Sequence, residues 1–143
     1  MNCDKGMQAG SSTLPSPSNF MIESLPCSCC TALCCGSVAL SRARLARIEA
    51  YLRTMPRTER KRLSKQRRGP LDCGFLDIEN HRCAIYPVRP WVCEAFGRVK
   101  GMQCPKVSGL VQIIPEFMQD AMFRAEYESG TALFSKNFDW REV

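Results

Sequence analysis

Apolar residues recur at helical spacing in the part of the chain that follows residue 41. These residues are Leu45, Ile48, Leu52 and Met55, and the spacings of three and four between them place them along one face of a helix. Ser41 is a suitable N-cap before this stretch, and Pro56 cannot continue a helix beyond it. The pattern therefore predicts an amphipathic helix between Ser41 and Pro56.

The next segment is polar and is followed by two short apolar pieces. Residues 57–68 read RTERKRLSKQRR, which favours a second short helix ended by Gly69 and Pro70. The apolar pieces, CGFLD at 73–77 and CAIYP at 83–87, are separated by a polar turn. They predict a small β-hairpin.

Proline and glycine mark the remaining elements. Pro90 stands near the start of VRPWVCEAFG, residues 88–97, and predicts a short helical turn. Pro115 begins and Gly130 ends a longer helical pattern, whereas GLVQII at 109–114 fits either a strand or a core loop. The overall prediction from these elements is a small single domain, mainly α with irregular loops and one short hairpin.

The first residues of the chain differ in composition from the rest. Residues 1–22 are rich in Ser, Pro and Gly, which predicts a flexible N-terminal tail, and residues 23–143 form the predicted domain. We find no apolar run as long as a signal-peptide core or a membrane span. We therefore expect a cytoplasmic protein without membrane contact, in a compartment that keeps thiols reduced.

Ten cysteines in 143 residues are the main chemical signal of the sequence. Five of them fall in CSCCTALCC, residues 27–35, and four more follow at intervals of ten or eleven residues, at Cys73, Cys83, Cys93 and Cys104. Such a density has three explanations, which are disulfides, a reactive nucleophile and bound metal.

Metal binding explains this pattern best. Adjacent Cys34 and Cys35 cannot join each other without strain, and bridges to distant cysteines need an oxidising compartment. A catalytic thiolate needs a base beside it, and His81 is the only histidine. Thiolates are soft ligands that suit zinc, iron and iron–sulfur clusters. We therefore expect metal to draw the cysteine segments together and to supply folding free energy. Residues 23–143 are thus predicted to be a cysteine-cluster metal-binding domain, organised around a cysteine–metal cluster.

The spacing of these cysteines resembles that of a known family. The motif runs Cys27-x2-Cys30-x3-Cys34-Cys35, then Cys73-Gly-Phe-Leu, then Cys83-x-Ile-Tyr-x2-Arg89-Pro90-x2-Cys93-x2-Phe96, and ends at Cys104. Over residues 25–105 this pattern is similar to that of the CxxCxxCC (YkgJ-type) cysteine-cluster family, a family of proposed zinc- or iron-chelating domains.

The resemblance implies zinc or iron as the cofactor, including an iron–sulfur cluster, and eight cysteine ligands. The implied ligands are Cys27, Cys30, Cys34, Cys35, Cys73, Cys83, Cys93 and Cys104. Cys29 is an alternative to Cys30, and Glu94 stands where members often carry an arginine. The cysteine cluster is also similar to that of the flagellin lysine N-methylases, which are much longer enzymes.

Several residues near the cysteines have expected supporting roles. A tetrathiolate zinc site carries a net charge of about −2, which the Arg89 guanidinium would offset through hydrogen bonds to sulfur. Phe75, Tyr86 and Trp91 are expected to be core residues that cover the site. Asp72 and Asp77 are alternative oxygen ligands for iron, although turn and cap roles suit them better.

Positive charge is concentrated in residues 42–68. This segment contains eleven basic and two acidic residues, a local charge of +9 in a chain of net charge +6, so the rest of the chain is negative. Such a segment is either a solvated helical face or a surface for nucleic acid or an acidic protein partner. The candidate contacts are Arg57, Arg60, Lys61, Arg62, Lys65, Arg67 and Arg68.

These observations leave three functional hypotheses. The first is a small cytoplasmic protein that binds zinc or iron in a structural or metal-handling role, with no catalytic residue. The second is an iron–sulfur-dependent enzyme or enzyme subunit for redox or methyl-transfer chemistry. The third is a metal-stabilised nucleic-acid-binding module. We favour the first hypothesis, because the chain is too short to combine the cluster with a methyl-donor domain.

Overall fold

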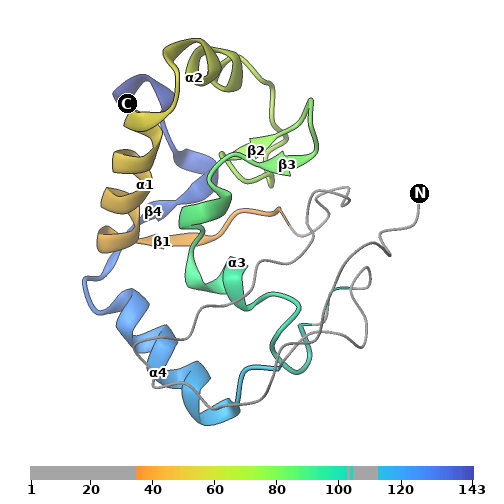
Figure 1. Ribbon diagram of the computed structural model, residues 1–143, viewed down its shortest axis with the longest axis vertical. Helices are drawn as coiled ribbons and strands as arrows, with labels where there is room; N and C mark the ends of the chain where they lie inside the picture. The colour runs from red at the N-terminus through yellow and green to blue at the C-terminus, as the bar shows by residue number, and fades with distance from the viewer. Residues whose placement is uncertain (1–34, 103, 105–112) are drawn as a thin grey trace.

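Four α-helices and two small antiparallel sheets form the described part of the molecule (Figure 1). The structure is a computed structural model in which residues 35–102, 104 and 113–143 are described. The expected mainly helical fold with irregular loops and a short hairpin is confirmed. The predicted tail, residues 1–22, lies outside the described residues, as does the cysteine cluster up to Cys34.

Helix α1 (Arg42–Thr54) follows the predicted apolar stripe. Its N-cap is Ser41, whose Oγ accepts a hydrogen bond from the backbone N–H of Arg44 at 3.0 Å, and it ends before the proline expected to stop it. Ile48 and Leu52 on the stripe are fully buried. The helix therefore forms because one apolar face packs into the core.

Helix α2 (Arg57–Ser64) is shorter than predicted, because Arg68 ties the following chain to the hairpin region. The Arg68 guanidinium donates to the carbonyl oxygens of Leu76 at 2.8 Å and Leu63 at 3.1 Å. It also lies 5.7 Å from the centre of the Trp140 ring. The chain therefore leaves the helix after its first eight residues, and the predicted extension to Arg68 is wrong.

The predicted hairpin is present as β2 (Leu76–Asp77) and β3 (Arg82–Cys83). The strands are antiparallel, with Leu76 opposite Cys83. In the turn between them His81 has a φ of 48°, a left-handed conformation that residues other than glycine rarely adopt. The hairpin thus carries both Cys83 and His81, the only histidine of the sequence.

A buried carboxylate joins this hairpin to α2. The side chain of Asp77 is only 1% exposed, and it accepts hydrogen bonds from Arg62 at 2.6 Å, Gln66 at 2.8 Å and Asn80 at 2.8 Å. Burial alone would raise the pKa of Asp77, but these hydrogen bonds hold the pKa well below its usual range. The carboxylate therefore stays ionised in the folded chain.

A second sheet pairs β1 (Ala39–Ser41) with β4 (Thr131–Phe134), which are far apart in the sequence. The strands are antiparallel, and Leu40 lies opposite Leu133. This sheet was not predicted, because strands of three and four residues are too short to show a clear alternation of apolar and polar positions.

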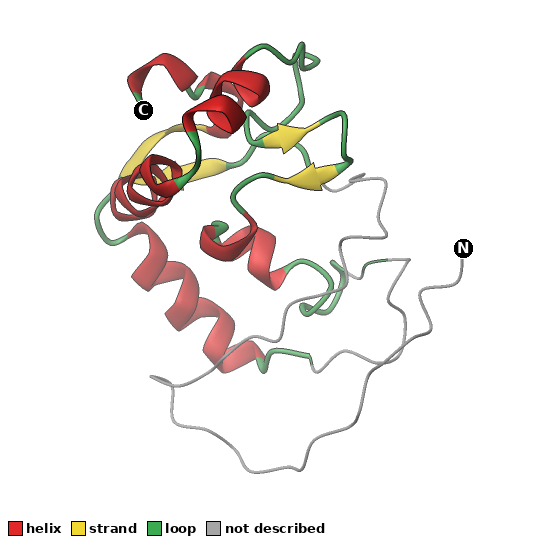
Figure 2. Ribbon diagram, turned by 45° about the horizontal axis from the view of Figure 1, so that its top comes forward, coloured by secondary structure: helices red, strands yellow, loops and turns green. Residues whose placement is uncertain are grey.

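Prolines open the two remaining helices, as predicted. Pro90 precedes α3 (Trp91–Ala95), and Pro115 precedes α4 (Glu116–Tyr127). Gly130, with a φ of 78°, ends the turn that follows α4. Helix α3 lies between the β2–β3 hairpin and α4 (Figure 1 and Figure 2).

Short 3₁₀ helices complete the described elements. They are η3 (Tyr86–Val88), η4 (Ser135–Asn137) and η5 (Trp140–Glu142). Ile113 and Ile114, the described part of the ambiguous segment 109–114, lie in a loop. Among the helices of the described residues, none has the length and apolar character needed to cross a bilayer.

The apolar core gathers residues from α1, α2, β1 and the segments around the hairpin. Its buried members are Leu40, Ile48, Leu52, Leu63, Phe75, Ile85 and Trp140. The centre of the Phe75 ring lies 4.5 Å from that of Phe138 and 6.1 Å from that of Trp140. This aromatic contact fixes the position of Phe75, which was predicted to be a core residue.

Residues 135–140 pack tightly against the loop that carries Cys73. The Gly74 N–H donates to the carbonyl oxygen of Ser135 at 3.1 Å, and the Trp140 indole N–H donates to the carbonyl oxygen of Gly74 at 3.0 Å. A Cβ atom at position 74 would lie 2.2 Å from the Ser135 carbonyl oxygen, so only glycine fits there. This close approach fixes the backbone next to Cys73.

Candidate metal centre

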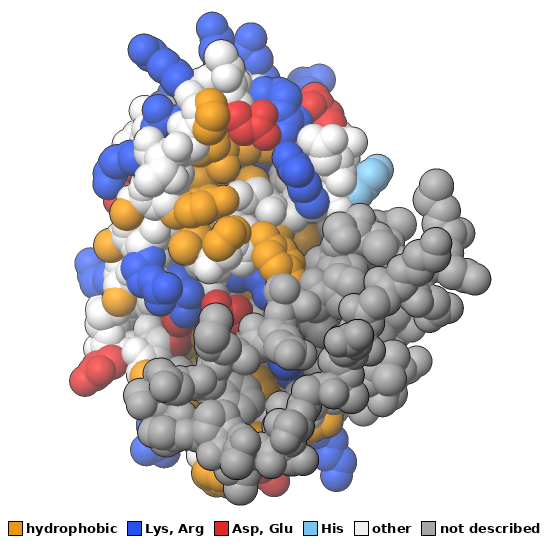
Figure 3. Space-filling view, in the orientation of Figure 1, with side chains coloured by type: hydrophobic (Ala, Val, Ile, Leu, Met, Phe, Trp, Pro, Cys, Tyr) orange, Lys and Arg blue, Asp and Glu red, His pale blue; other side chains and the backbone are white. Residues whose placement is uncertain are grey.

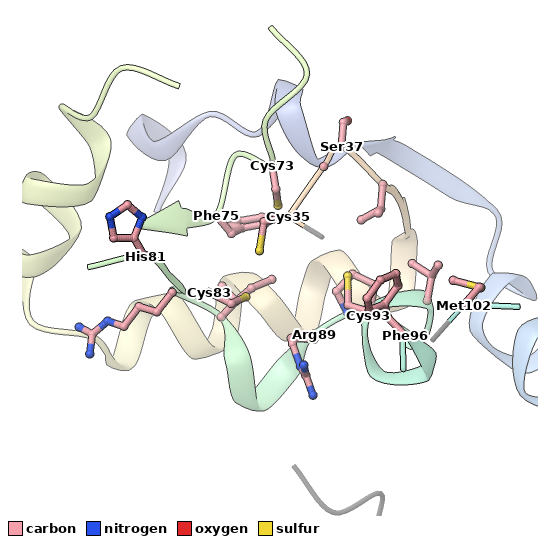
Figure 4. Close-up of a pocket in the computed structure, with 16 residues that line it drawn as sticks. Cys35, Ser37, Cys73, Phe75, His81, Cys83, Arg89, Cys93, Phe96 and Met102 are labelled. Carbon is pink, nitrogen blue, oxygen red and sulfur yellow. The ribbon is translucent and has the colours of Figure 1, made fainter. Parts of the chain in front are cut away.

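Four of the predicted metal-binding cysteines line one cavity of about 320 Å³ (Figure 4). Cys35 precedes β1, Cys73 precedes β2, Cys83 lies on β3 and Cys93 lies on α3. Each comes from its own piece of backbone, as the spacing predicted. The fold therefore gathers thiols that are far apart in the sequence.

Backbone hydrogen bonds hold Cys35 and Cys73 side by side. The N–H of Cys73 donates to the carbonyl oxygen of Cys35 at 3.0 Å. The N–H of Ser37 donates to the carbonyl oxygen of Leu71, also at 3.0 Å. These contacts fix the relative position of the two cysteine backbones without help from the side chains.

The other two thiols come from the opposite side of the cavity. Cys83 is carried by β3, and the Cys93 N–H donates to the carbonyl oxygen of Pro90 at 2.9 Å in the first turn of α3. Figure 4 shows the sulfur atoms of Cys35 and Cys73 pointing toward the side that carries Cys83 and Cys93. The four thiols therefore face a shared space from two walls.

Apolar side chains form much of the cavity wall. They are Val38, Phe75, Ile85, Val92, Phe96 and Met102. A hydrophobic shell of this kind limits the access of water to the sulfur atoms and lowers the local dielectric constant. The cavity therefore offers soft donor atoms in surroundings of low polarity.

The thiols do not converge on a preformed ion site. Among the described residues, no three His, Cys, Asp or Glu side chains lie close enough together to hold a metal ion. Cys104 is half-buried and is not one of the described residues that line the cavity. The predicted ligands Cys27, Cys30 and Cys34 and the alternative Cys29 lie outside the described residues. The structure thus brings together four of the eight predicted ligands.

A comparison with protein families connects this arrangement to metal binding. A family model described as "CxxCxxCC: Putative zinc- or iron-chelating domain" matches residues 26–122. The chain belongs to the CxxCxxCC family. The matched residues make up more than half of the chain and include all eight predicted metal-binding cysteines. Neither the curated proteins nor the solved structures that were searched contain a match to it.

Arg89 of the CxxCxxCC motif borders the cavity, but its charged end points elsewhere. The residue is 9% exposed, and its guanidinium carbon lies 3.8 Å from the centre of the Tyr86 ring, a cation–π contact. In Figure 4 the guanidinium points away from the labelled sulfur atoms. The hydrogen bond from Arg89 to a cysteine therefore stays a prediction.

A buried arginine near the cavity was missed in the sequence-based prediction. An Arg44 Nη atom lies 2.6 Å from Glu126 and another lies 3.6 Å from Glu94, so Arg44 joins α1 to α4 and α3. Burial works to lower the pKa of Arg44, but the hydrogen bond and charge of Glu126 outweigh it and raise the pKa, with a smaller contribution from Cys93. Arg44 therefore belongs to a buried ion-pair network that joins α1, α3 and α4 next to Cys93.

The sequence contained a signal for this buried arginine. Arg44 precedes Ile48 by four residues and Leu52 by eight, so it shares the buried face of α1. Glu94, at the position where members of the CxxCxxCC family often carry an arginine, is half-buried. Burial raises the pKa of Glu94, although Arg44 and Arg89 act to lower it. A charge on the buried face of a helix indicates a buried ion pair.

The two aspartates considered as oxygen ligands have structural roles. Asp72 accepts a hydrogen bond from the backbone N–H of Gly69 at 2.6 Å, and Asp77 holds the hairpin against α2. Neither is among the described residues that line the cavity. The hydrogen bond of Asp72 agrees with the turn role expected of it, whereas Asp77 binds side chains and has neither a turn nor a cap role.

His81 lies at the rim of the cavity, on the hairpin side (Figure 4). Its side chain is exposed, which agrees with the solvated turn residue expected from the sequence. Its place among the residues that line the cavity was not predicted, because the turn conformation that directs it there is not visible in the sequence.

The predicted contacts of the basic segment divide into two groups. The exposed group consists of Arg57, Lys61, Lys65 and Arg67. Arg62 and Arg68 turn inward and donate to carboxylate and carbonyl oxygens, and Arg60 is half-buried. The positive charge that the sequence assigns to one segment is therefore partly used inside the fold.

Proposed function

We propose that this chain binds zinc or iron through cysteine thiolates at the cavity and serves a structural or metal-handling role in the reducing cytoplasm. The observation that carries the proposal is the meeting of Cys35, Cys73, Cys83 and Cys93, from four separate segments, around one space. Thiols gathered in this way in a reducing compartment are typical of metal sites.

The described residues fit the donor chemistry of such a site. Thiolate sulfur is the preferred ligand of zinc and of iron–sulfur centres, and the Zn–S bond is about 2.3 Å long. The thiols line a cavity of about 320 Å³. Among the described residues no three potential ligands lie close enough together to hold an ion, so metal binding requires the thiols to move closer together. The proposal completes the ligand set with Cys27, Cys30, Cys34 and Cys104.

The remaining residues position the thiols and offset their charge. The backbone contact between Cys35 and Cys73 holds two proposed ligands in register, and the aliphatic and aromatic walls give the thiols surroundings of low polarity. Arg44 lies close enough to Cys93 to respond to its charge.

The proposal assigns no catalytic step to this chain. A thiolate nucleophile needs a base that is held against it. His81, the only imidazole in the sequence, is exposed at the cavity rim rather than packed against a thiol. The residues of the cavity are therefore suited to hold an ion rather than to move protons.

The test is elemental analysis of the full chain purified under anaerobic, reducing conditions. We expect zinc or iron at a fixed ratio to protein, and we expect Cys73→Ser and Cys93→Ser each to remove most of it. Cys3→Ser is the matched control, because it removes one thiol that is not in the proposed ligand set, and its metal content is expected to be unchanged. Metal-free protein, or equal loss in all three variants, would contradict the proposal.

An absorption spectrum of the same sample separates the two metals. Zinc bound to thiolates gives a colourless protein and supports the structural role. Iron with visible absorption bands supports the iron–sulfur alternative, in which the centre takes part in redox or methyl-transfer chemistry.

A further inference from the structure

The outward face of α2 carries positive charge that the fold does not neutralise. Arg57, Lys61 and Lys65 follow one another at intervals of four residues, which places them in a row along one side of the helix. All three are exposed, as is Arg67 just beyond the helix. Among the described residues, none of the four has a carboxylate within ion-pair distance. Figure 3 shows Lys and Arg side chains gathered along the edge of the molecule formed by α2.

The inward side of the same helix shows where the acidic residues are used. Arg62 lies 2.5 to 2.7 Å from carboxylate oxygens of Glu59, Asp77 and Glu79. Glu59 is the only acidic residue of α2, so its charge is directed to Arg62 and away from the row. The helix therefore has one face in which charges are paired and one face that is purely basic.

The side chains of this face indicate the kind of partner. The large apolar side chains that are exposed in the described residues are Leu71, Ile113, Phe117, Phe123 and Phe134, and none of them lies on α2. The buried core of a protein interface is enriched in apolar and aromatic residues, and helices that lie on membranes need an apolar face. Single strands are held by aromatic side chains on which bases stack. The phosphates of a duplex need only positive charge.

We propose that the row formed by Arg57, Lys61 and Lys65, extended by Arg67, binds the phosphate backbone of double-stranded nucleic acid without reading its sequence. The row is about 12 Å long, given a rise of 1.5 Å per residue. A duplex carries one charge per roughly 1.7 Å of its axis, so several phosphates lie within reach of these side chains. This proposal does not depend on the identity of the metal or on the ligand set.

The test is fluorescence anisotropy with a labelled DNA duplex of about 20 base pairs and mixed sequence, titrated with the full metal-loaded chain at several salt concentrations. The variant combines Arg57→Gln, Lys61→Gln and Lys65→Gln, since glutamine keeps the helix propensity. The control combines Lys100→Gln, Arg124→Gln and Lys136→Gln, which are also exposed and remove the same net charge elsewhere. Circular dichroism checks that both variants fold.

We expect the α2 variant to bind the duplex about tenfold more weakly. The magnitude of the slope of log affinity against log salt concentration is expected to fall by about 3. The control is expected to change affinity less than about threefold. A scrambled duplex is expected to bind as tightly as the first one.

Three outcomes would overturn the proposal. They are no binding of the duplex by the unmodified chain, equal loss of affinity in variant and control, and tighter binding to a single strand, to polyglutamate or to anionic vesicles than to the duplex. The last outcome would assign the surface to a different class of partner. None of these results bears on metal content, so each of the two proposals can fail without affecting the other.

Discussion

The scaffold of the molecule and its cysteine cavity are held together by different interactions. The scaffold, made of α1, α2 and the two sheets, has an apolar core and a buried carboxylate with several hydrogen-bond donors. The cavity lies beside this core, and its thiols face a space that the described side chains leave open. The scaffold is thus stabilised by packing, whereas the thiols of the cavity lie around a space that is not filled by the described side chains.

This difference separates the part of the chain that folds by apolar packing from the part that is proposed to bind metal. Phe75 belongs to the core and also lines the cavity, so the scaffold places the backbones of the neighbouring cysteines. We therefore expect folding free energy from the metal to act mainly on the cavity side and on α3, while the scaffold depends on its apolar core. The predictions that follow separate the two contributions.

The largest expected effect is on the scaffold. Leu52 is fully buried in the core and does not line the cavity. Leu52→Ala is expected to lower the free energy of unfolding by about 3 kcal/mol, because the substitution removes buried methyl groups and leaves a void. Denaturant unfolding followed by circular dichroism measures this change.

Leu71→Ala is the matched control for that substitution. Leu71 is 75% exposed, so the same change of side chain is expected to alter stability by less than about 0.5 kcal/mol. Similar losses of unfolding free energy in both variants would show that the apolar core does not stabilise the scaffold, which would contradict the comparison of the two regions.

A smaller effect is expected from the buried carboxylate. Asp77→Asn removes the charge that Arg62 faces and is expected to cost about 2 kcal/mol at neutral pH. The folded chain holds the pKa of Asp77 below its unfolded value, so its contribution is complete above that unfolded value, about 4, and is lost as the pH falls further. The stability difference between the parent chain and the variant is therefore expected to shrink between pH 5 and pH 2.

Asp139→Asn serves as the control for the pH dependence. Asp139 is paired with exposed Arg141, which holds the pKa of Asp139 at about 2. Exposed pairs contribute little to stability, so this variant is expected to unfold like the parent chain at pH 7. A stability difference for Asp77→Asn that stayed constant down to pH 2 would contradict the buried charge.

The smallest effect on the scaffold is expected from removal of metal. The two tryptophans report on the two regions, because Trp140 lies in the core and Trp91 lies on α3. A chelator is expected to change the emission of the parent chain and to leave the emission of a Trp91→Phe variant, which reports on Trp140, nearly unchanged. Most of the helical circular dichroism is expected to remain.

A different result would show that the stability of the scaffold and that of the cavity are coupled. If the chelator shifted the emission of Trp140 and abolished the unfolding transition, the scaffold would depend on metal as well. Equal emission changes in the parent chain and in Trp91→Phe would lead to the same conclusion.

Local signals in the sequence were sufficient for much of the scaffold. The stripe that contains Ile48 and Leu52 predicted α1, and the capping role of Ser41 is confirmed by its hydrogen bond to the Arg44 N–H. Prolines predicted the starts of α3 and α4. These features depend on residues a few positions apart, and a single sequence shows such relations directly.

Contacts between distant segments could not be predicted in the same way. The β1–β4 pairing and the approach of Ser135 to Gly74 depend on tertiary packing. The basic segment could be counted, but its charge could not be divided between buried Arg44, inward-facing Arg62 and exposed Lys61. Of the eight cysteines predicted as ligands, four line one cavity in the described part of the chain, and that cavity could not be seen in the sequence.

The close approach of Ser135 to Gly74 has a consequence for how the protein is made. A chain synthesised from its N-terminus releases all four cavity cysteines from the ribosome before Ser135 emerges. Until then the loop that carries Cys73 lacks the neighbour that fixes its backbone, so this loop takes its final position only after translation has passed Ser135.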